Sequence, residues 1–257
     1  IPMGLLRNRS PRAFVASVVA GLNNGMGQLV GVGIACAVAG LVVGTLSMAD
    51  LTGKISSGMF TLAGGSYALT LLVATVVIIL LGMGMPTPAV YALSAVLAAP
   101  ALLALKIELL PAHLFIVYFA SMSAITPPVA VAAFAAASIA RANPIAVAFV
   151  ACRVGIVAFV LPLVFVSQPG LLLMGDAATV VTTIGFVLMG AMCLVIAFEG
   201  WLFGLVATPL RAALVVLAIV LLAQSGAARW GAAAAFLALL VWRYRRRSAA
   251  SPRSAPA

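Results

Sequence analysis

Long apolar runs alternate along this chain with short groups of polar, glycine and proline residues. An α-helix needs about 20 apolar residues to cross the hydrocarbon core of a bilayer, which is about 30 Å thick. Three runs reach or approach this length: residues 29–48, 145–166 and 180–198. We expect each of them to form a membrane-spanning helix, although Arg153 and Pro162 interrupt the second one.

Two shorter apolar runs, residues 66–81 and 89–105, are separated by a turn rich in glycine and proline. As helices they measure about 24–26 Å, which is less than the thickness of the hydrocarbon core. This pattern predicts a re-entrant hairpin over residues 66–105 whose tip ends inside the membrane. Two full spans are the alternative, because both arrangements return the chain to the same side.

A second pair of short runs, His113–Ala124 and Val129–Ala140, would form helices of about 18 Å each. Together they are long enough for one crossing. We therefore expect residues 113–140 to be a single discontinuous transmembrane helix that is interrupted near its middle.

The remaining segments complete a division of the chain into four parts. Residues 1–28 are predicted to be a basic, water-facing start and an interfacial amphipathic helix that ends at the turn Asn23–Gly25. Residues 29–167 form the transport unit, and residues 168–242 supply additional C-terminal transmembrane helices. The last two of these are either tilted crossings or a shallow pair. Residues 243–257 are a basic tail that we expect to be disordered.

The composition indicates an all-α integral membrane protein, a multi-span helical bundle. Of 257 residues, 65% are hydrophobic and 7% are charged, whereas about a quarter of a soluble domain is charged. The formal net charge of +10 is located at helix ends and in the tail, which fits the positive-inside rule better than nucleic-acid binding. If residues 66–105 do not cross and the tail is cytoplasmic, both termini are expected in the cytoplasm.

Two segments interrupt the apolar helices in a similar way: residues 82–88, Gly-Met-Gly-Met-Pro-Thr-Pro, and residues 123–128, Ser-Ala-Ile-Thr-Pro-Pro. Glycine and proline at this density break a helix. In a membrane such breaks persist where protein covers them or a cavity hydrates them, and transporters use them to bind ions and substrates. Threonine is a good N-cap and proline suits the first helical position, so each Thr-Pro pair is predicted to open a new half-helix.

The oxygen atoms of these breaks predict a combined sodium and substrate site. Backbone carbonyls and hydroxyls suit Na⁺, and exposed helix N-termini suit a carboxylate. The predicted site residues are Gly82, Met83, Gly84, Met85, Pro86, Thr87, Ser123, Ala124, Ile125, Thr126 and Pro127, with Na⁺ held by backbone carbonyls and by the hydroxyls of Thr87 and Thr126. The opposing interpretation is that the prolines only kink helices for packing.

The residue types favour sodium coupling over proton coupling. Neither break contains Asp or Glu, whereas proton-coupled transporters usually carry a titratable group in the membrane. The single histidine, His113, lies at a helix start near water, where an interfacial role is expected. Arg153 is a candidate for binding a substrate carboxylate, and snorkelling to the cytoplasmic interface is its alternative role.

Enzymatic chemistry is not expected for this chain. The sequence contains no HExxH or GxSG motif and no paired membrane aspartates. Cys36, Cys152 and Cys193 lie inside apolar runs at no metal-ligand spacing, so we interpret them as buried hydrophobic residues. No cofactor is expected besides Na⁺ as the coupling ion.

Five stretches together resemble the large membrane subunit of TRAP transporters. They are residues 82–88, Ala98–Leu102, Ala112–Phe115, Ser123–Ala130 and Ala151–Gly155. The similarity covers roughly residues 10–175. Within this family, the chain looks most like the fused permeases that work with TAXI-class binding proteins.

This resemblance implies an elevator-type, Na⁺-driven importer of organic acids such as dicarboxylates in the bacterial inner membrane, with a fold like that of the ion transporter superfamily. In such permeases two inverted repeats each supply a hairpin and an unwound helix, and this chain shows one such set, on residues 66–140. We therefore expect the C-terminal half of a permease. Its expected partners are the N-terminal half, the small-subunit helices, a periplasmic substrate-binding protein, the lipid bilayer and a small carboxylate. A proton-coupled transporter, or a channel or scaffold domain without sodium coupling, is the alternative function.

Overall fold

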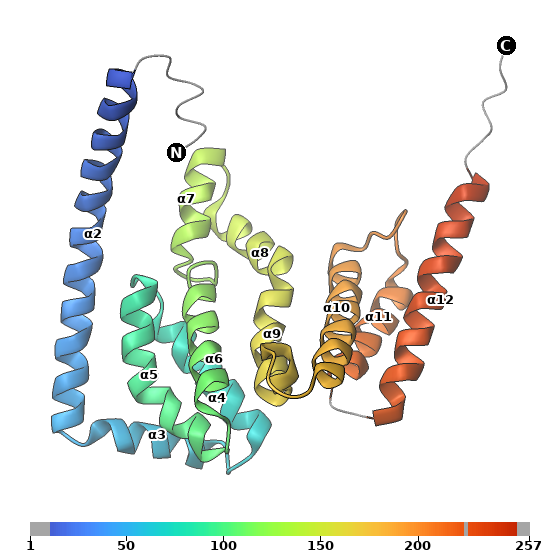
Figure 1. Cartoon of the computed structure of the whole chain (residues 1–257), viewed down its shortest axis with the longest axis horizontal. Coiled ribbons are helices and arrows are strands. Elements are labelled where there is room, and N and C mark those ends of the chain that lie inside the picture. The colour runs from blue at the N-terminus through green and yellow to red at the C-terminus, as the bar shows by residue number, and fades with distance from the viewer. Residues whose placement is uncertain (1–10, 224–225, 251–257) are drawn as a thin grey trace.

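The computed structural model describes residues 11–223 and 226–250 (Figure 1). Within them the chain forms helices and no β-strand, apart from one bridge between Trp201 and Leu205. In chain order the elements are α2 (Pro11–Met48), α3 (Leu51–Leu62), α4 (Tyr67–Leu81), α5 (Thr87–Ala104), α6 (Leu109–Met122), α7 (Val131–Ala140), α8 (Pro144–Val154), α9 (Ile156–Ser167), the 3-10 helix η1 (Pro169–Leu172), α10 (Ala177–Glu199), α11 (Thr208–Leu222) and α12 (Gly226–Ala250).

Several helices have the length and composition of membrane spans, which confirms the predicted all-α, multi-span class. Among the described residues, Phe14–Met48, Thr87–Ala104 and Ala177–Glu199 qualify by themselves. α7 and α8 qualify as a pair, but a bend of 118° separates them. The apolar helices α4, α6, α9 and α11 are shorter than the hydrocarbon core is thick. The choice between tilted crossings and a shallow pair for α11 and α12 stays a prediction.

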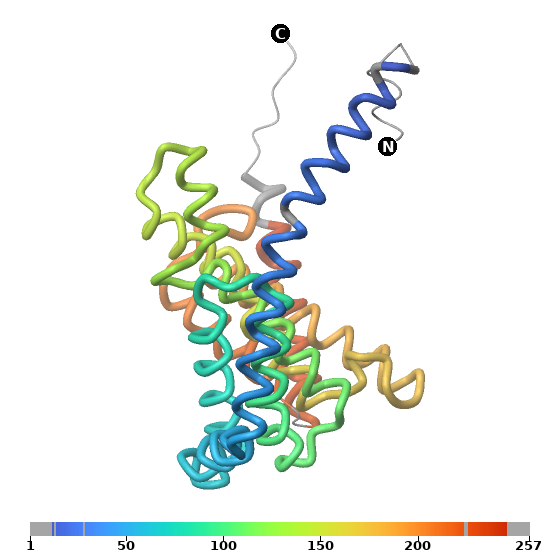
Figure 2. Tube along the Cα trace, turned by 90° about the vertical axis from the view of Figure 1, so that its left-hand side faces the viewer, coloured from blue at the N-terminus to red at the C-terminus, as the bar shows by residue number. Residues whose placement is uncertain are grey.

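α2 is one continuous helix of 38 residues, so the predicted turn at Asn23–Gly25 and the separate interfacial helix are wrong. Asparagine and glycine each weaken a helix by up to about 1 kcal/mol relative to alanine. Opening the backbone among apolar residues costs several kcal/mol for each group left unpaired in lipid, so the helix continues. At about 1.5 Å per residue α2 is about 57 Å long, and its N-terminal part extends beyond the other helices in Figure 2.

The described helices pack into two large hydrophobic clusters and a small third one of Ala130, Ala133 and Ala148, between α7 and α8. The first contains Ile78, Val90, Phe115, Phe119 and Phe165, from α4, α5, α6 and α9. α5 lies at its centre, because it packs against α2, α3, α4 and α6. The second cluster is formed by α10, α11 and α12, and α9 and η1 join it to the first (Figure 1). The predicted division of the chain into four parts stays a prediction.

α4 and α5 form the two limbs of a helical hairpin and pack against each other. α4 ends at Leu81, and α5 begins at Thr87 after a short turn. Pro100 lies inside α5 and does not end it. The two limbs thus agree with the predicted hairpin, while its re-entrant position in the membrane stays a prediction.

The helix predicted over residues 113–140 is interrupted as expected. α6 ends at Met122, and α7 begins at Val131. The intervening segment makes several turn hydrogen bonds but no helix. α7 then packs against α8, which turns back beside it.

The next predicted span is also broken, but at an unexpected residue. Gly155 separates α8 from α9, so the expected interruptions at Arg153 and Pro162 are wrong. Arg153 is part of the last turn of α8, and Pro162 lies inside α9. A proline within a helix removes one hydrogen bond, which is a smaller disturbance than the complete break at the glycine.

α12 continues to Ala250, so the expected disorder of the tail is wrong for residues 243–250; residues 251–257 lie outside the described residues. Arg243 Nη1 donates hydrogen bonds to the carbonyl oxygens of Leu202 and Leu205, both at 3.2 Å, in the loop between α10 and α11. Alanine and arginine are also strong helix formers. A tertiary contact and local propensity therefore extend the helix where composition alone predicts disorder.

Candidate functional site

The two predicted breaks lie against each other in the folded chain. Ser123 Oγ donates hydrogen bonds to the carbonyl oxygens of Ala120, at 2.7 Å, and of Gly82, at 3.2 Å. Gly82 is the first residue after α4, and a Cβ atom on it would overlap the Ser123 side chain. Two segments 41 residues apart in the sequence therefore meet at a contact that a glycine permits.

The junction between α8 and α9 lies against the second break and forms a third side of the same region. The Cys152 thiol donates a long hydrogen bond of 3.4 Å to the carbonyl oxygen of Ile125. A Cβ atom at Gly155 would lie 3.3 Å from Ile125 Cδ1, so the missing side chain allows a close approach. Sequence reasoning missed Cys152 and Gly155 as site residues. The stretch Ala151–Gly155, which carries part of the family resemblance, is the signal that could have found them.

Six helices end or begin at this meeting point. The C-terminal ends of α4, α6 and α8 lie here, together with the N-terminal ends of α5, α7 and α9. A helix carries a partial negative charge at its C-terminus and a partial positive charge at its N-terminus. The backbone thus offers favourable electrostatics to a cation and to an anion in one region, although neither predicted break contains an ionisable residue.

The hairpin tip presents free backbone oxygens. Gly84 has φ of 86°, a left-handed conformation that favours glycine. In the described part of the chain, the carbonyl oxygens of Met83, Gly84 and Met85 accept no backbone hydrogen bond. The carbonyl of Pro86, in contrast, accepts two, from the amides of Ala89 at 3.0 Å and Val90 at 3.2 Å. Three neighbouring carbonyl oxygens of this kind suit a cation such as Na⁺.

The carbonyl oxygens of Ser123, Ala124 and Ile125 in the second break already accept hydrogen bonds from outside a regular helix. The oxygen of Ser123 accepts a hydrogen bond from Thr126 N at 3.3 Å, and that of Ala124 accepts one from Ala132 N at 2.9 Å. The oxygen of Ile125 accepts the thiol described above. Buried N–H groups need acceptors, and the turns and the start of α7 supply such donors. Each carbonyl oxygen has a second lone pair, so these atoms retain capacity for a cation.

Neither threonine caps a helix as predicted. Thr87 is the first residue of α5, and its N-cap is Pro86. Thr126 Oγ1 donates to the carbonyl oxygen of Met122 at 2.7 Å, and α7 begins only at Val131. A threonine hydroxyl readily bonds to the carbonyl four residues before it. The two prolines that follow, joined by a cis peptide bond, have no N–H that a cap could satisfy.

Arg153 lies in the last turn of α8, close to the α8–α9 junction, but it pairs with a carboxylate of the chain itself. Its Nη2 lies 3.0 Å from Glu199 Oε2 at the end of α10, and the two side chains are 49% and 41% exposed. Ion pairs of this exposure contribute about 0–1 kcal/mol, so a substrate carboxylate can compete for the guanidinium. The role of Arg153 in substrate binding stays a prediction.

His113 lies on α6, where its Nδ1 is 2.9 Å from the hydroxyl of Tyr91 on α5. The two rings are arranged edge to face with centroids 5.9 Å apart. His113 thus joins one limb of the hairpin to the discontinuous helix. Its interfacial role stays a prediction.

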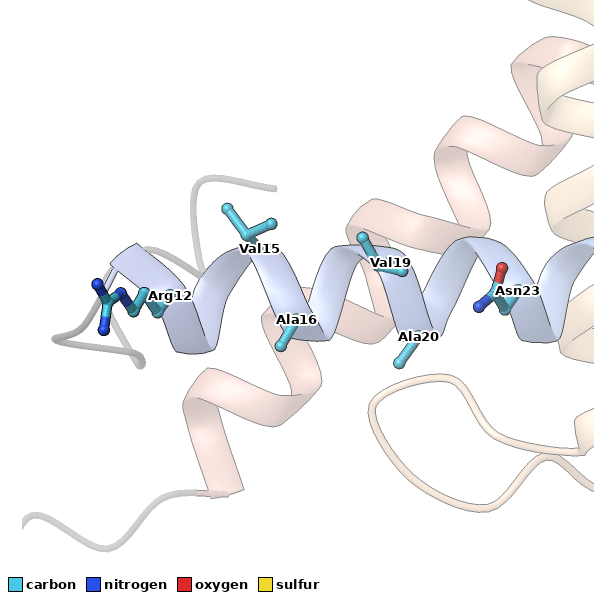
Figure 3. Close-up of a pocket in the computed structure, with 6 residues that line it drawn as sticks. All are labelled: Arg12, Val15, Ala16, Val19, Ala20 and Asn23. Atoms are coloured by element: carbon cyan, nitrogen blue, oxygen red, sulfur yellow. The ribbon is translucent and has the colours of Figure 1, made fainter.

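A hollow of about 650 Å³ lies on the N-terminal part of α2, away from the breaks. Figure 3 shows that its lining residues, from Arg12 to Asn23, all belong to this one helix. The hollow is open and largely apolar, and a single helix cannot surround a ligand. The convergence of the three breaks therefore remains the better candidate site.

Comparison with protein families decides what kind of protein carries this site. A profile described as "Tripartite ATP-independent periplasmic transporter, DctM component" matches residues 3–180. The chain belongs to the DctM family. The match includes the hairpin, both predicted breaks and the junction at Gly155, and it ends near the start of α10. No curated protein and no solved structure matches the chain.

DctM membership makes the chain a membrane component of a TRAP transporter, as the sequence resemblance predicted. Its apolar helices agree with a multi-pass membrane protein. The tripartite family also implies partnership with a periplasmic binding protein and a small membrane subunit. α11 and α12 lie beyond the matched residues.

Proposed function

We propose that this DctM-family chain is the permease component of a Na⁺-coupled importer of a small carboxylate. It works with a periplasmic binding protein of the TAXI class, in the bacterial inner membrane, with both termini in the cytoplasm. The observation that carries this proposal is the meeting of the hairpin tip with the break after α6 at the Gly82–Ser123 contact. Family membership supports transport, and the oxygen-rich, acid-free breaks support sodium as the coupling ion.

In this proposal Na⁺ binds between the hairpin tip and the second break. Its ligands are carbonyl oxygens of Met83, Gly84 and Met85 and the hydroxyl oxygens of Thr87 and Thr126. Because the Thr126 hydroxyl donates its proton to Met122, its lone pairs are available to a cation. The partial negative charges at the C-terminal ends of α4 and α6 favour the same ion.

Coupling to the substrate follows from the contact between the two breaks. A cation shared by the tip and the second break holds them together, and this fixes the N-terminal ends of α5 and α9. Those ends carry partial positive charge, which suits a carboxylate. An ion that binds one arrangement of the breaks better than another shifts the population toward that arrangement.

The decisive experiment is thermal unfolding of the purified chain in NaCl and in KCl at equal ionic strength. A ligand that binds only the folded form raises the unfolding temperature, so we expect a higher midpoint in NaCl, with saturation as Na⁺ increases. Equal midpoints in the two salts would refute the sodium site. Choline chloride serves as a second control for ionic strength.

Transport itself is tested with the complete transporter in proteoliposomes. Uptake of a labelled carboxylate is expected to require both a sodium gradient and the binding protein. Uptake that follows a proton gradient would identify the proton-coupled alternative. Uptake that is independent of the binding protein would favour a channel, and a scaffold domain would show neither response.

A further inference from the structure

A groove outside the candidate site runs along α10. It has a volume of about 420 Å³, and its apolar walls come from α9, α10 and the loop that follows α10. Val157, Leu188, Met192 and Trp201 are among the residues that line it. Leu188 and Trp201 are 60% and 59% exposed, so the groove faces outward from a helix that qualifies as a membrane span. Most of it lies beyond the residues that the DctM family matches.

Arginines gather near the end of α10, where the last residues of this groove lie. Arg211 Nε donates to the carbonyl oxygen of Ala197 at 2.6 Å, next to Ile196, which lines the groove. Arg243 Nη1 donates to the carbonyl oxygen of Leu202 at 3.2 Å, and Leu202 is also a groove residue. One end of the groove therefore lies close to carbonyl oxygens that accept hydrogen bonds from guanidinium groups.

The charge at this end is positive. Arg153, Arg211 and Arg243 surround the end of α10, and in the described residues the carboxylate paired with them is that of Glu199. Three cationic side chains and one anionic side chain leave a surplus of two positive charges. Hydrogen bonds to neutral carbonyls do not cancel this charge, and the C-terminal dipole of α10 offsets about half a unit of it.

We propose that the groove binds an anionic phospholipid, with an acyl chain along α10 and the phosphate beside Arg211 and Arg243. The surplus charge favours an anionic headgroup over a zwitterionic one. Trp201 at the same end is a residue type that gathers at the level of lipid headgroups. Because Val157 belongs to α9 and Leu188 to α10, the lipid contacts both of these helices.

The test compares phosphatidylglycerol with phosphatidylcholine of identical acyl chains, added to the purified full chain in mild detergent. The readouts are the unfolding temperature and the bound lipid seen by native mass spectrometry. We expect phosphatidylglycerol to bind about tenfold more tightly and to raise the unfolding temperature more. Equal effects of the two lipids would overturn the proposal, since they would indicate general solvation of an apolar surface.

Variants on α10 locate the binding site. Ala191→Trp fills the groove, and Leu188→Asn places a polar group on its wall; each is expected to weaken phosphatidylglycerol binding about tenfold, as for the loss of one buried apolar side chain. Val181→Trp and Val181→Asn are matched controls, because Val181 is 68% exposed on the same helix but does not line the groove. These controls are expected to bind as the unmodified chain does.

Two other outcomes would overturn the assignment. Phosphatidylglycerol binding that persists in both groove variants would place the lipid elsewhere. A change in the number of chains per complex in Ala191→Trp, with lipid binding unchanged, would identify the groove as an interface between copies of this chain. Since the readouts do not involve sodium, failure here leaves the proposed transport function unaffected.

Discussion

At the scale of single residues, Gly82 is where the two breaks come closest. It has ordinary helical backbone angles, with φ of −76°, so its importance is steric and not conformational. The Ser123 side chain occupies the space that a Cβ atom would need. The hydrogen bond from Ser123 to the Gly82 carbonyl depends on this close approach.

Gly82→Ala is expected to destabilise the chain by about 1–3 kcal/mol, because overpacking forces the surrounding side chains and backbone to shift. Thermal or chemical unfolding measures the loss. Ser123→Gly in the same chain removes the clashing atoms and is expected to restore much of the stability. Gly185→Ala is the control, since no atom lies within 4 Å of the Cβ position there. An equal loss in Gly185→Ala would show that the effect is not specific to the contact.

Thr126→Val is expected to reduce the sodium-dependent rise in unfolding temperature while leaving the fold intact. The substitution keeps the shape of the side chain but removes the hydroxyl oxygen proposed as a Na⁺ ligand. Thr182→Val is a close control, because Thr182 Oγ1 also donates to the carbonyl four residues back, Ala178, at 2.7 Å. Both variants lose one such hydrogen bond, worth about 1 kcal/mol. A sodium response that is unchanged in Thr126→Val would exclude this hydroxyl from the site.

At the scale of elements, arginine side chains donate hydrogen bonds to carbonyl oxygens at the C-terminal ends of helices. Arg211 donates from Nη2 to the carbonyl oxygen of Phe198 at 3.0 Å, and Arg229 donates from Nε to that of Leu221 at 3.2 Å. The last carbonyls of a helix have no intrahelical partner. Positive side chains satisfy them and also complement the helix dipole. The chain contains four acidic residues and fourteen basic ones, so most of its cations must find acceptors other than carboxylates.

Asp176 is the N-cap of α10. Its Oδ2 accepts a hydrogen bond from Thr179 N at 3.1 Å, and its Oδ1 accepts one from the Thr179 hydroxyl at 2.6 Å. The Thr179 hydroxyl, and then the backbone amide, lower the pKa of this carboxyl from its ordinary value. Asp176 therefore acts as the N-cap of α10.

Asp176 is expected to make the stability of α10 depend on pH. Its pKa is lower in the folded chain than in the unfolded one, so the stabilisation is present above the unfolded value, about pH 4. It is lost as the pH falls through the folded pKa. Unfolding temperatures of the unmodified chain and of Asp176→Asn, measured between about pH 3 and pH 6, should converge at the acidic end. A difference that stays constant over this range would contradict the assignment.

At the scale of the whole molecule, the two large hydrophobic clusters contain different parts of the protein. The hairpin belongs to the first cluster, α10, α11 and α12 form the second, and Ala130 at the end of the second break packs with α7 and α8 in the third. The contacts between them pass mainly through α9, η1 and the start of α10 (Figure 1). Sodium binding at the breaks should therefore stabilise the region around the breaks more than it stabilises the second cluster.

Hydrogen exchange is expected to show this difference. Addition of Na⁺ should slow exchange at residues 82–86 and 123–130, relative to K⁺, because a bound ion suppresses local opening. Exchange within α11 should change little. Mass spectrometry of peptic fragments gives the measurement, because each fragment reports on one segment. Uniform protection of both clusters would argue for a general salt effect instead of a local site.

Much of the fold was predictable because its causes are local. The apolar runs, the hairpin limbs of α4 and α5, and the interruption after Met122 all follow from the residue types within each segment. The continuous α2 was not predictable in this way. Its Asn23–Gly25 stretch has turn character, but the penalty of a few tenths to about 1 kcal/mol per residue is too small to open a helix.

The sequence by itself determined the helix interruptions at residues 82–86 and after Met122, and that no acidic side chain lies in the two predicted breaks, because these are properties of short segments. Only the tertiary structure decided which breaks meet: Ser123 at Gly82, Cys152 and Gly155 at Ile125, and Arg153 at Glu199. These pairs are 27 to 46 residues apart. No local preference brings such residues together, since their contact is set by how whole helices bury their apolar faces. The candidate site is therefore a consequence of packing, built from breaks that the sequence already contains.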